Sequence, residues 1–144
     1  EYWTEEEQKR RFAHKIKQGG KLFTPDFLLP EEIVLKKVRG HGNDLQILEE
    51  RTINWIEAKM FYGASTIPHG TPSAVGSILP KAKKYVEEFG EGAIVFMYGC
   101  GDRLAADLAE IGVTVLDCSG TVWLKKVHEH QRKWCANQKG ELLP

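Results

Sequence analysis

The strongest constraint on the fold lies in the stretch from residue 53 to residue 59, whose sequence is Ile-Asn-Trp-Ile-Glu-Ala-Lys. Its apolar alternation is typical of a β-strand. Side chains two positions apart on a strand point to the same face, so we expect Glu57 and Lys59 together on one face, with Ile56 and Ala58 on the other. A core strand does not need such a charged pair, and the pattern therefore predicts a functional site here.

A second carboxylate, Asp26, follows Thr24 and Pro25 within another apolar stretch. If that stretch is a strand next to residues 53–59, Asp26 can approach Glu57 and Lys59. Two carboxylates bind a hard cation such as Mg²⁺, which can activate a water while an ammonium group neutralises charge on a phosphate. Plainer alternatives are a turn or cap aspartate for Asp26, and an edge-strand ion pair for Glu57 with Lys59.

Pro25-Asp26 followed by Glu57-Ala58-Lys59 resembles the signature of the PD-(D/E)xK nuclease superfamily. A wider set of segments resembles the TPD-motif family, which includes the codanin-interacting nuclease and is related to archaeal Holliday-junction resolvases. The resemblance extends from about Lys21 to about Cys118. Its segments are Lys21-Leu22-Phe23-Thr24-Pro25-Asp26, Trp55-Ile56-Glu57-Ala58-Lys59-Met60-Phe61-Tyr62-Gly63, Phe89-Gly90-Glu91-Gly92-Ala93-Ile94-Val95 and Met97-Tyr98-Gly99.

The resemblance implies a Mg²⁺- or Mn²⁺-dependent nuclease that acts on DNA, including branched DNA. Asp26 and Glu57 would bind the metal ion together with the main-chain carbonyl of Ala58. Lys59 would position the attacking water and stabilise the transition state. Lys81 would complete the site, in the place where relatives carry glutamine or lysine, and Lys81 and Lys84 would contact phosphate; a solvated lysine cluster is the plainer alternative for these two.

The same resemblance supplies a second hypothesis, an adaptor that keeps the nuclease fold and acts through a protein partner of the codanin type. Asp26, Glu57 and Lys59 are all present. This favours the enzyme over the adaptor, because a site that no longer catalyses a reaction tends to lose at least one charged residue. Cleavage of branched DNA would favour a homodimer, since two symmetric cuts need two sites.

Composition sets the class of protein. The chain has 144 residues with 42% hydrophobic content, enough for one domain with a core. Twenty basic and twenty acidic side chains cancel, so nucleic acid would have to bind a local patch. Three scattered cysteines and the lack of a long apolar run favour an intracellular protein, in the nucleus or the cytoplasm, with no membrane partner.

Patterning predicts an α/β fold in which a mixed central sheet is flanked by helices and the strand with Glu57 is central. The resemblance implies that this fold is a restriction-endonuclease-like core. We expect one domain over residues 1–144, with an N-terminal helix in 1–20 and a C-terminal helix and tail in 121–144. The expected helices are residues 4–17, 80–89, 102–111 and 121–138, the first opening with a capping box of Thr4 and Glu7. The expected strands are residues 22–29, 45–59, 93–97 and 113–116, and residues 33–38 form either another strand or a continuation of the first.

In the helix at 80–89, Ala82, Val86 and Phe89 form the predicted buried stripe, while Lys81, Lys83, Lys84 and Tyr85 remain outside it. The loop at 63–76 follows the proposed site and could form one wall of a cleft. Its histidine, His69, is expected to be solvated.

Three other interpretations are less favoured. Gly99 and Gly101 between a strand and a helix, with Asp117 ending the next strand, partly match a dinucleotide-binding unit, but Leu104 replaces the third glycine. Near the C-terminus, a stripe containing Trp123 and Trp134 is more typical of a core or dimer contact than of base stacking. His128, His130 and Cys135 make a poor zinc site, because the two histidines lie on different helix faces.

Overall fold

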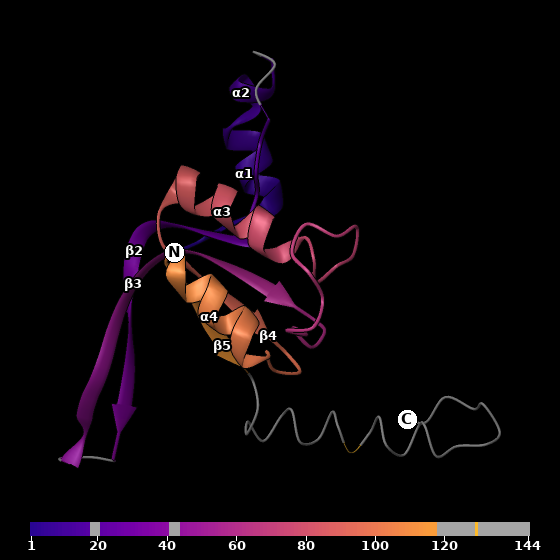
Figure 1. The fold of residues 1–144 in the computed structure, drawn as a ribbon. Helices are drawn as coiled ribbons and strands as arrows, with labels where there is room; N and C mark the ends of the chain where they lie inside the picture. The colour runs from indigo at the N-terminus through magenta and orange to yellow at the C-terminus, as the bar shows by residue number, and fades with distance from the viewer. Residues whose placement is uncertain (18–20, 41–43, 118–128, 130–144) are drawn as a thin grey trace.

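The structure, a computed structural model, describes residues 1–17, 21–40, 44–117 and 129. Within these residues it contains a mixed five-stranded sheet flanked by helices (Figure 1). The strands are β1 (Trp3–Thr4), β2 (Phe27–Arg39), β3 (Gln46–Lys59), β4 (Gly92–Phe96) and β5 (Val113–Asp117), and the helices are α1 (Glu5–Arg11), α2 (Ala13–Lys17), α3 (Ile78–Phe89) and α4 (Asp102–Glu110). The predicted α/β class is confirmed.

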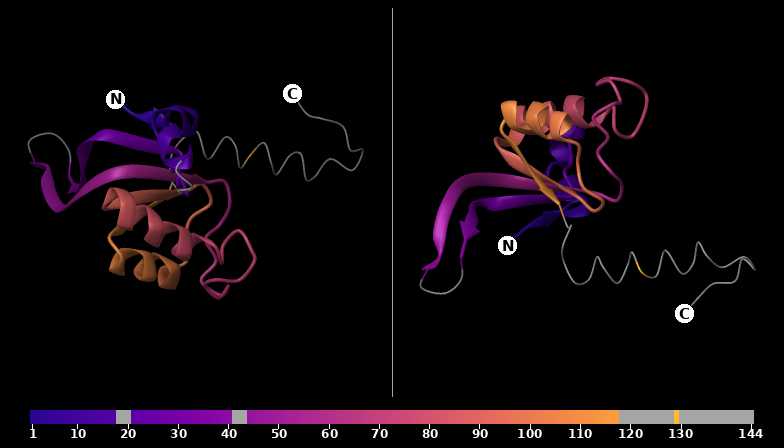
Figure 2. Two further views of the ribbon diagram at one scale, coloured as in Figure 1. Left: turned by 90° about the horizontal axis from the view of Figure 1, so that it is seen from above. Right: turned by 60° about the horizontal axis from the view of Figure 1, so that its bottom comes forward.

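The sheet order β1-β2-β3-β4-β5 places β3 in the middle, as expected for the strand that carries Glu57 and Lys59. β1, β2 and β3 pair antiparallel, whereas β3, β4 and β5 pair parallel. The parallel strands are joined through α3 and α4, which lie side by side over one face of the sheet (Figure 2). The predicted strand–helix–strand unit from β4 to β5 is therefore confirmed.

Aromatic side chains fill the core between the sheet and the helices. Trp55 of β3 packs edge-on against Tyr85 of α3, with ring centroids 5.1 Å apart. The Trp55 indole N–H donates to the Gly90 carbonyl at 2.8 Å, so its one polar group is satisfied. Phe96 and Leu108 are also fully buried. The prediction that Tyr85 lies outside the buried stripe of α3 is wrong, because only 1% of its surface is exposed.

The N-terminal helix is interrupted. The capping box predicted at Thr4 and Glu7 is present, with reciprocal hydrogen bonds between the two residues. A single helix over residues 4–17 is not: α1 ends at Phe12, whose amide donates to the Gln8 carbonyl at 2.9 Å, and α2 begins at Ala13. Lys15 then forms an ion pair with Glu88 that links α2 to α3.

The first long strand begins at Phe27, five residues later than predicted. Pro25 has no N–H to give to a ladder, and side chains occupy the carbonyls of Thr24 and Pro25. From Phe27 the chain continues as one strand to Arg39, with a register shift between Leu28 and Ile33, so the two segments predicted at 22–29 and 33–38 are parts of one element.

The expected C-terminal helix at 121–138, with its tryptophan stripe and with His128, His130 and Cys135, lies outside the described residues. Among the helices that the structure does describe, each is too short or too polar to cross a bilayer.

We predict that Gly92→Ala destabilises the fold by about 2 to 3 kcal/mol, as overpacking of a core does. A Cβ at Gly92 would overlap the Trp55 indole, which is buried and held by its hydrogen bond. Urea denaturation measures the change.

Gly70→Ala is the matched control. Gly70 has a φ of 82° but nothing within 4 Å of an added Cβ, so the substitution should cost about 1 kcal/mol of backbone strain. Equal losses in the two variants would show that the indole moves aside freely.

Candidate active site

The pairing of β2 with β3 brings Asp26 next to Glu57. Phe27 and Ile56 are opposite each other in the ladder, so the preceding and following residues meet at its end. The Asp26 amide donates to Glu57 Oε2 at 3.1 Å, and the Ala58 amide donates to Asp26 Oδ2 at 2.7 Å. Each carboxylate is therefore held by the backbone of the other strand.

Two lysines share the second oxygen of Glu57. Lys59 Nζ lies 2.5 Å and Lys81 Nζ 3.0 Å from Glu57 Oε1. Only 3% of Glu57 is exposed, and burial of a charged group is unfavourable unless the group is paired and hydrogen-bonded. Lys59 comes from the same face of β3, as its spacing predicts, whereas Lys81 reaches the site from α3.

Tyr85 and Lys81 lie beside each other and shift each other's pKa. Burial, reinforced by the Glu57 charge, raises the pKa of Tyr85 to about 12, even though Lys81 works against the shift. Burial by itself lowers the pKa of Lys81, but the interactions with Tyr85 and Glu57 outweigh it and raise that pKa above its ordinary value. Both groups therefore hold their protons well above neutral pH.

Two buried polar side chains hold the Thr24-Pro25-Asp26 segment from opposite sides. Tyr85 donates its hydroxyl to the Thr24 carbonyl at 2.9 Å. Gln8, which is fully buried in α1, donates its Nε2 to the Pro25 carbonyl at 2.8 Å. These two hydrogen bonds position the backbone from which Asp26 projects.

Sequence reasoning missed both Gln8 and Tyr85, although the sequence contained a signal for each. Gln8 lies four positions before Phe12, on the apolar face of the first helix. Tyr85 lies three positions after Ala82, on the buried stripe of α3. A polar group on such a face is buried, and it then needs a hydrogen-bond partner from another element.

A third carboxylate, Glu5, lies at the edge of the site. Thr24 Oγ1 is 3.4 Å from Glu5 Oε1. The hydrogen bond and charge of Lys9 lower the pKa of Glu5, and Lys81 adds to the effect. In the described residues, no group of three or more His, Cys, Asp or Glu side chains is arranged to hold a metal ion. The oxygen donors for a cation are thus Asp26 and Glu57, with the Ala58 carbonyl beside them.

A basic cavity of about 450 Å³ adjoins Lys81. Lys21 and Lys84 lie above the Phe23 ring, with Nζ-to-centroid distances of 5.5 Å and 5.1 Å. The lining residues are Lys21, Phe23, Gly70, Thr71, Ser77, Pro80, Lys81 and Lys84. The loop before α3 thus forms one wall of this cavity, and Lys84 lies in the cavity without touching Glu57.

The other candidate positions have different roles. His69 Nε2 lies 2.7 Å from Asp107 Oδ2, which ties the loop to α4. At the start of α4, the Leu104 amide donates to Ser65 Oγ at 3.1 Å, and a Cβ on Gly101 would overlap Ser65. Ser65 thus occupies the helix N-terminus where a dinucleotide would need to place its pyrophosphate.

The family comparison places the chain in a family by sequence alone. Residues 1–119 match the model of the family described as "Protein of unknown function TPD sequence-motif". The match covers most of the chain and includes every residue of the candidate site, so the chain belongs to the TPD-motif family. No match was found among curated proteins or among solved structures.

Tyr85→Phe should lower the free energy of unfolding at neutral pH by about 1 kcal/mol, because the Thr24 carbonyl loses its donor. The same substitution should also make the free energy of unfolding fall less steeply with pH in the alkaline range. Tyr85 keeps its proton to about pH 12 when folded but loses it near its ordinary pKa of 10.0 when unfolded, so the wild type loses stability as pH rises between these values. Urea denaturation from pH 8 to pH 12 measures both effects.

Tyr62→Phe is the control, since Tyr62 is exposed in the following loop. It should change neutral stability by less than about 0.5 kcal/mol. A Tyr85→Phe profile that runs parallel to the wild type above pH 10 would contradict the assignment.

Proposed function

We propose that this protein is a Mg²⁺- or Mn²⁺-dependent nuclease of the PD-(D/E)xK type, which hydrolyses phosphodiester bonds of DNA, including branched DNA. The observation that carries the proposal is the adjacency of Asp26 and Glu57 across β2 and β3, with Lys59 and Lys81 on the same carboxylate. Two neighbouring carboxylates can hold a divalent cation, and an adjacent ammonium group can neutralise charge that develops on a phosphate.

The donor set suits a small hard cation. Mg²⁺ prefers oxygen ligands and is commonly held by one or two carboxylates, with waters and substrate phosphates completing its shell. Asp26 and Glu57 supply the carboxylates. The Ala58 amide points at Asp26, and the amide and carbonyl of one strand residue face the same edge, so the Ala58 carbonyl is on that side too. When bound, the metal ion would lower the pKa of a water and polarise the phosphate.

The lysines have two tasks in this proposal. They pair with Glu57 in a buried place, since each ammonium lies within hydrogen-bonding distance of Oε1. They also supply positive charge where a phosphate gains negative charge in the transition state. Lys59 would orient the attacking water, and Lys81, which is more exposed, would face the substrate.

The basic cavity supports nucleic acid as the substrate. The whole chain has no net charge, so a polyanion is attracted only by a local patch. Lys21, Lys81 and Lys84 form such a patch, and Lys81 links it directly to Glu57. Phe23, whose ring both Lys21 and Lys84 approach, adds an aromatic group that could contact a base or sugar.

An adaptor that acts through a protein partner of the codanin type is the alternative. The buried charge cluster favours catalysis, because desolvating Glu57 and its lysines is unfavourable for a protein that only needs a binding surface. Calorimetric titration separates the two proposals: absence of Mg²⁺ and Mn²⁺ binding, with no cleavage of linear or branched DNA, would favour the adaptor.

Asp26→Asn should reduce cleavage by about 1,000-fold or more, equivalent to about 4 kcal/mol in the activation barrier. The new amide oxygen can still accept from the Ala58 amide, so the fold should persist while the charge for the metal is lost. Cleavage of linear and four-way-junction DNA with Mg²⁺ or Mn²⁺ is the measurement, beside circular dichroism.

Asp44→Asn, the same chemical change at an exposed aspartate, should retain full activity. Undiminished cleavage by Asp26→Asn protein would refute the assigned site.

Lys84→Ala should weaken DNA binding uniformly across sequences and lower the slope of log K against log salt by about 1, as expected for one lost phosphate contact. Fluorescence anisotropy between 50 mM and 200 mM salt covers a suitable range. Lys83→Ala is the control, because Lys83 is exposed on the same helix but does not line the cavity. If Lys84→Ala and Lys83→Ala weaken DNA binding equally, the DNA does not contact the cavity.

A further inference from the structure

The distal parts of β2 and β3 form a two-stranded arm that projects from the body of the protein (Figure 1). β1 pairs with β2 only at Phe27 and Leu28. β4 pairs with β3 only from Ile56 to Lys59. Residues 33–39 of β2 and 46–53 of β3 therefore pair only with each other, and no other described strand extends the sheet beside them.

One face of this arm is largely apolar, and we call it the outer face. Residues opposite each other in an antiparallel ladder share a face, as do alternate residues of one strand. The pairs Val34 with Thr52, Lys36 with Glu50, and Val38 with Ile47 thus lie on the same face. Val34, Val38 and Ile47 are 46–50% exposed, and Leu48, the extra residue at the neighbouring bulge, is 49% exposed.

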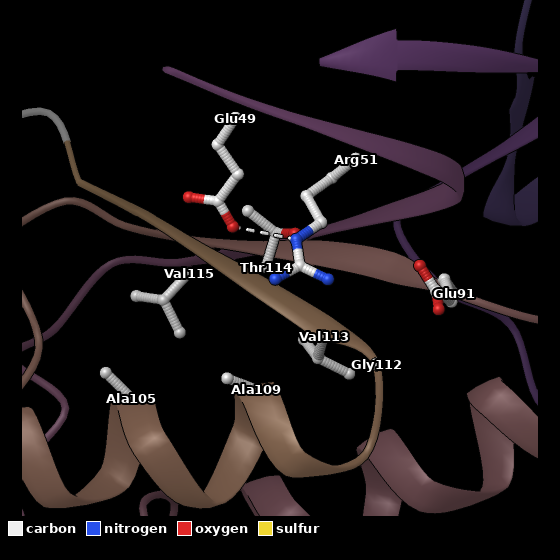
Figure 3. Close-up of a pocket in the computed structure, with 9 residues that line it drawn as sticks. All are labelled: Glu49, Arg51, Glu91, Ala105, Ala109, Gly112, Val113, Thr114 and Val115. Atoms are coloured by element: carbon white, nitrogen blue, oxygen red, sulfur yellow. Dashed lines mark hydrogen bonds and ion pairs between the residues drawn. The ribbon is translucent and has the colours of Figure 1, made fainter. Parts of the chain in front are cut away.

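The opposite face of the arm is turned towards the body. Glu49 and Arg51 alternate with the outer-face residues, and both point towards β5 and α4 (Figure 3). They line a cavity of about 250 Å³ together with residues of those two elements. The outer face consequently points away from the body, which agrees with the exposure of its apolar side chains.

We propose that the outer face binds the outer face of a second copy of this chain. An isolated two-stranded hairpin is only marginally stable in water and gains stability when its apolar face is covered. Exposed clusters of apolar side chains, when contiguous and rimmed by polar residues, often mark interaction sites. The outer face has apolar residues towards both ends and one basic and one acidic residue, Lys36 and Glu50, in its middle. Two copies of such a face can pack against each other when a two-fold axis relates them.

The charges select the arrangement. Lys36 Nζ and Glu50 Oε1 form an ion pair at 3.0 Å across the arm, and each side chain is half exposed. A two-fold axis along the arm places β2 of one copy over β3 of the other, so Lys36 faces Glu50 of the second copy. An axis across the arm would place Lys36 over Lys36. The favourable pairing has both arms pointing in the same direction.

Sedimentation equilibrium of the full chain tests this proposal. Between about 1 µM and about 100 µM, a range that brackets weak dimers, the mass should rise from near 16.3 kDa towards twice that value. Ile47→Glu should weaken the dimer at least about 10-fold, because it places an unpaired charge in an apolar contact. Ala106→Glu, which adds the same charge at an exposed position of α4, should leave the dimer unchanged.

Lys36→Glu and Glu50→Lys should each weaken the dimer, and the double exchange should restore it. Asp26→Asn should dimerise like the wild type, so this test stands apart from the proposed nuclease activity. A wild-type protein that stays at 16.3 kDa throughout would overturn the proposal. If its arm amides also resist hydrogen exchange, another segment of the same chain covers the outer face instead of a second copy. Equal dimerisation of Ile47→Glu and Ala106→Glu would overturn it as well.

Discussion

The site depends on one buried carboxylate. Glu57 accepts from Lys59 and Lys81 on one oxygen and from the Asp26 amide on the other, and these partners come from β3, α3 and the segment before β2. A charge withdrawn from water is tolerated only when such partners surround it. Glu57 thus joins three parts of the chain that are distant in sequence, and the packing of α3 on the sheet determines whether the cluster forms.

The Thr24-Pro25-Asp26 segment shows how packing and chemistry are connected. Its proline cannot join a ladder, and the two carbonyls before Asp26 are held by the side chains of Tyr85 and Gln8. Both donors are core residues of helices, so a change in the core would shift the backbone that carries the acid. The aspartate is therefore positioned by hydrogen bonds from α1 and α3 and by the end of the β2–β3 ladder.

The two ends of the β2–β3 pair have different environments. Near Glu57 the strands are covered by α3 and extended by β1 and β4, and the alternate side chains Ile53, Trp55 and Glu57 are buried. Towards residues 38 and 47 the same strands have no sheet neighbours in the described chain, and their apolar residues are half exposed. One hairpin thus supports a charged, buried site at one end and an apolar, exposed surface at the other.

The sequence by itself determined β3, β4 and β5, the capping box at Thr4, and the shared face of Glu57 and Lys59, because these follow from local periodicity and local hydrogen bonds. Only the tertiary structure decided the break at Phe12, the late start of β2 at Phe27, and the burial of Tyr85 and Gln8. Periodicity predicts that a face is buried, but not which backbone carbonyl it meets. That depends on how helices pack on the sheet, since a buried donor must take the acceptor that packing brings within reach.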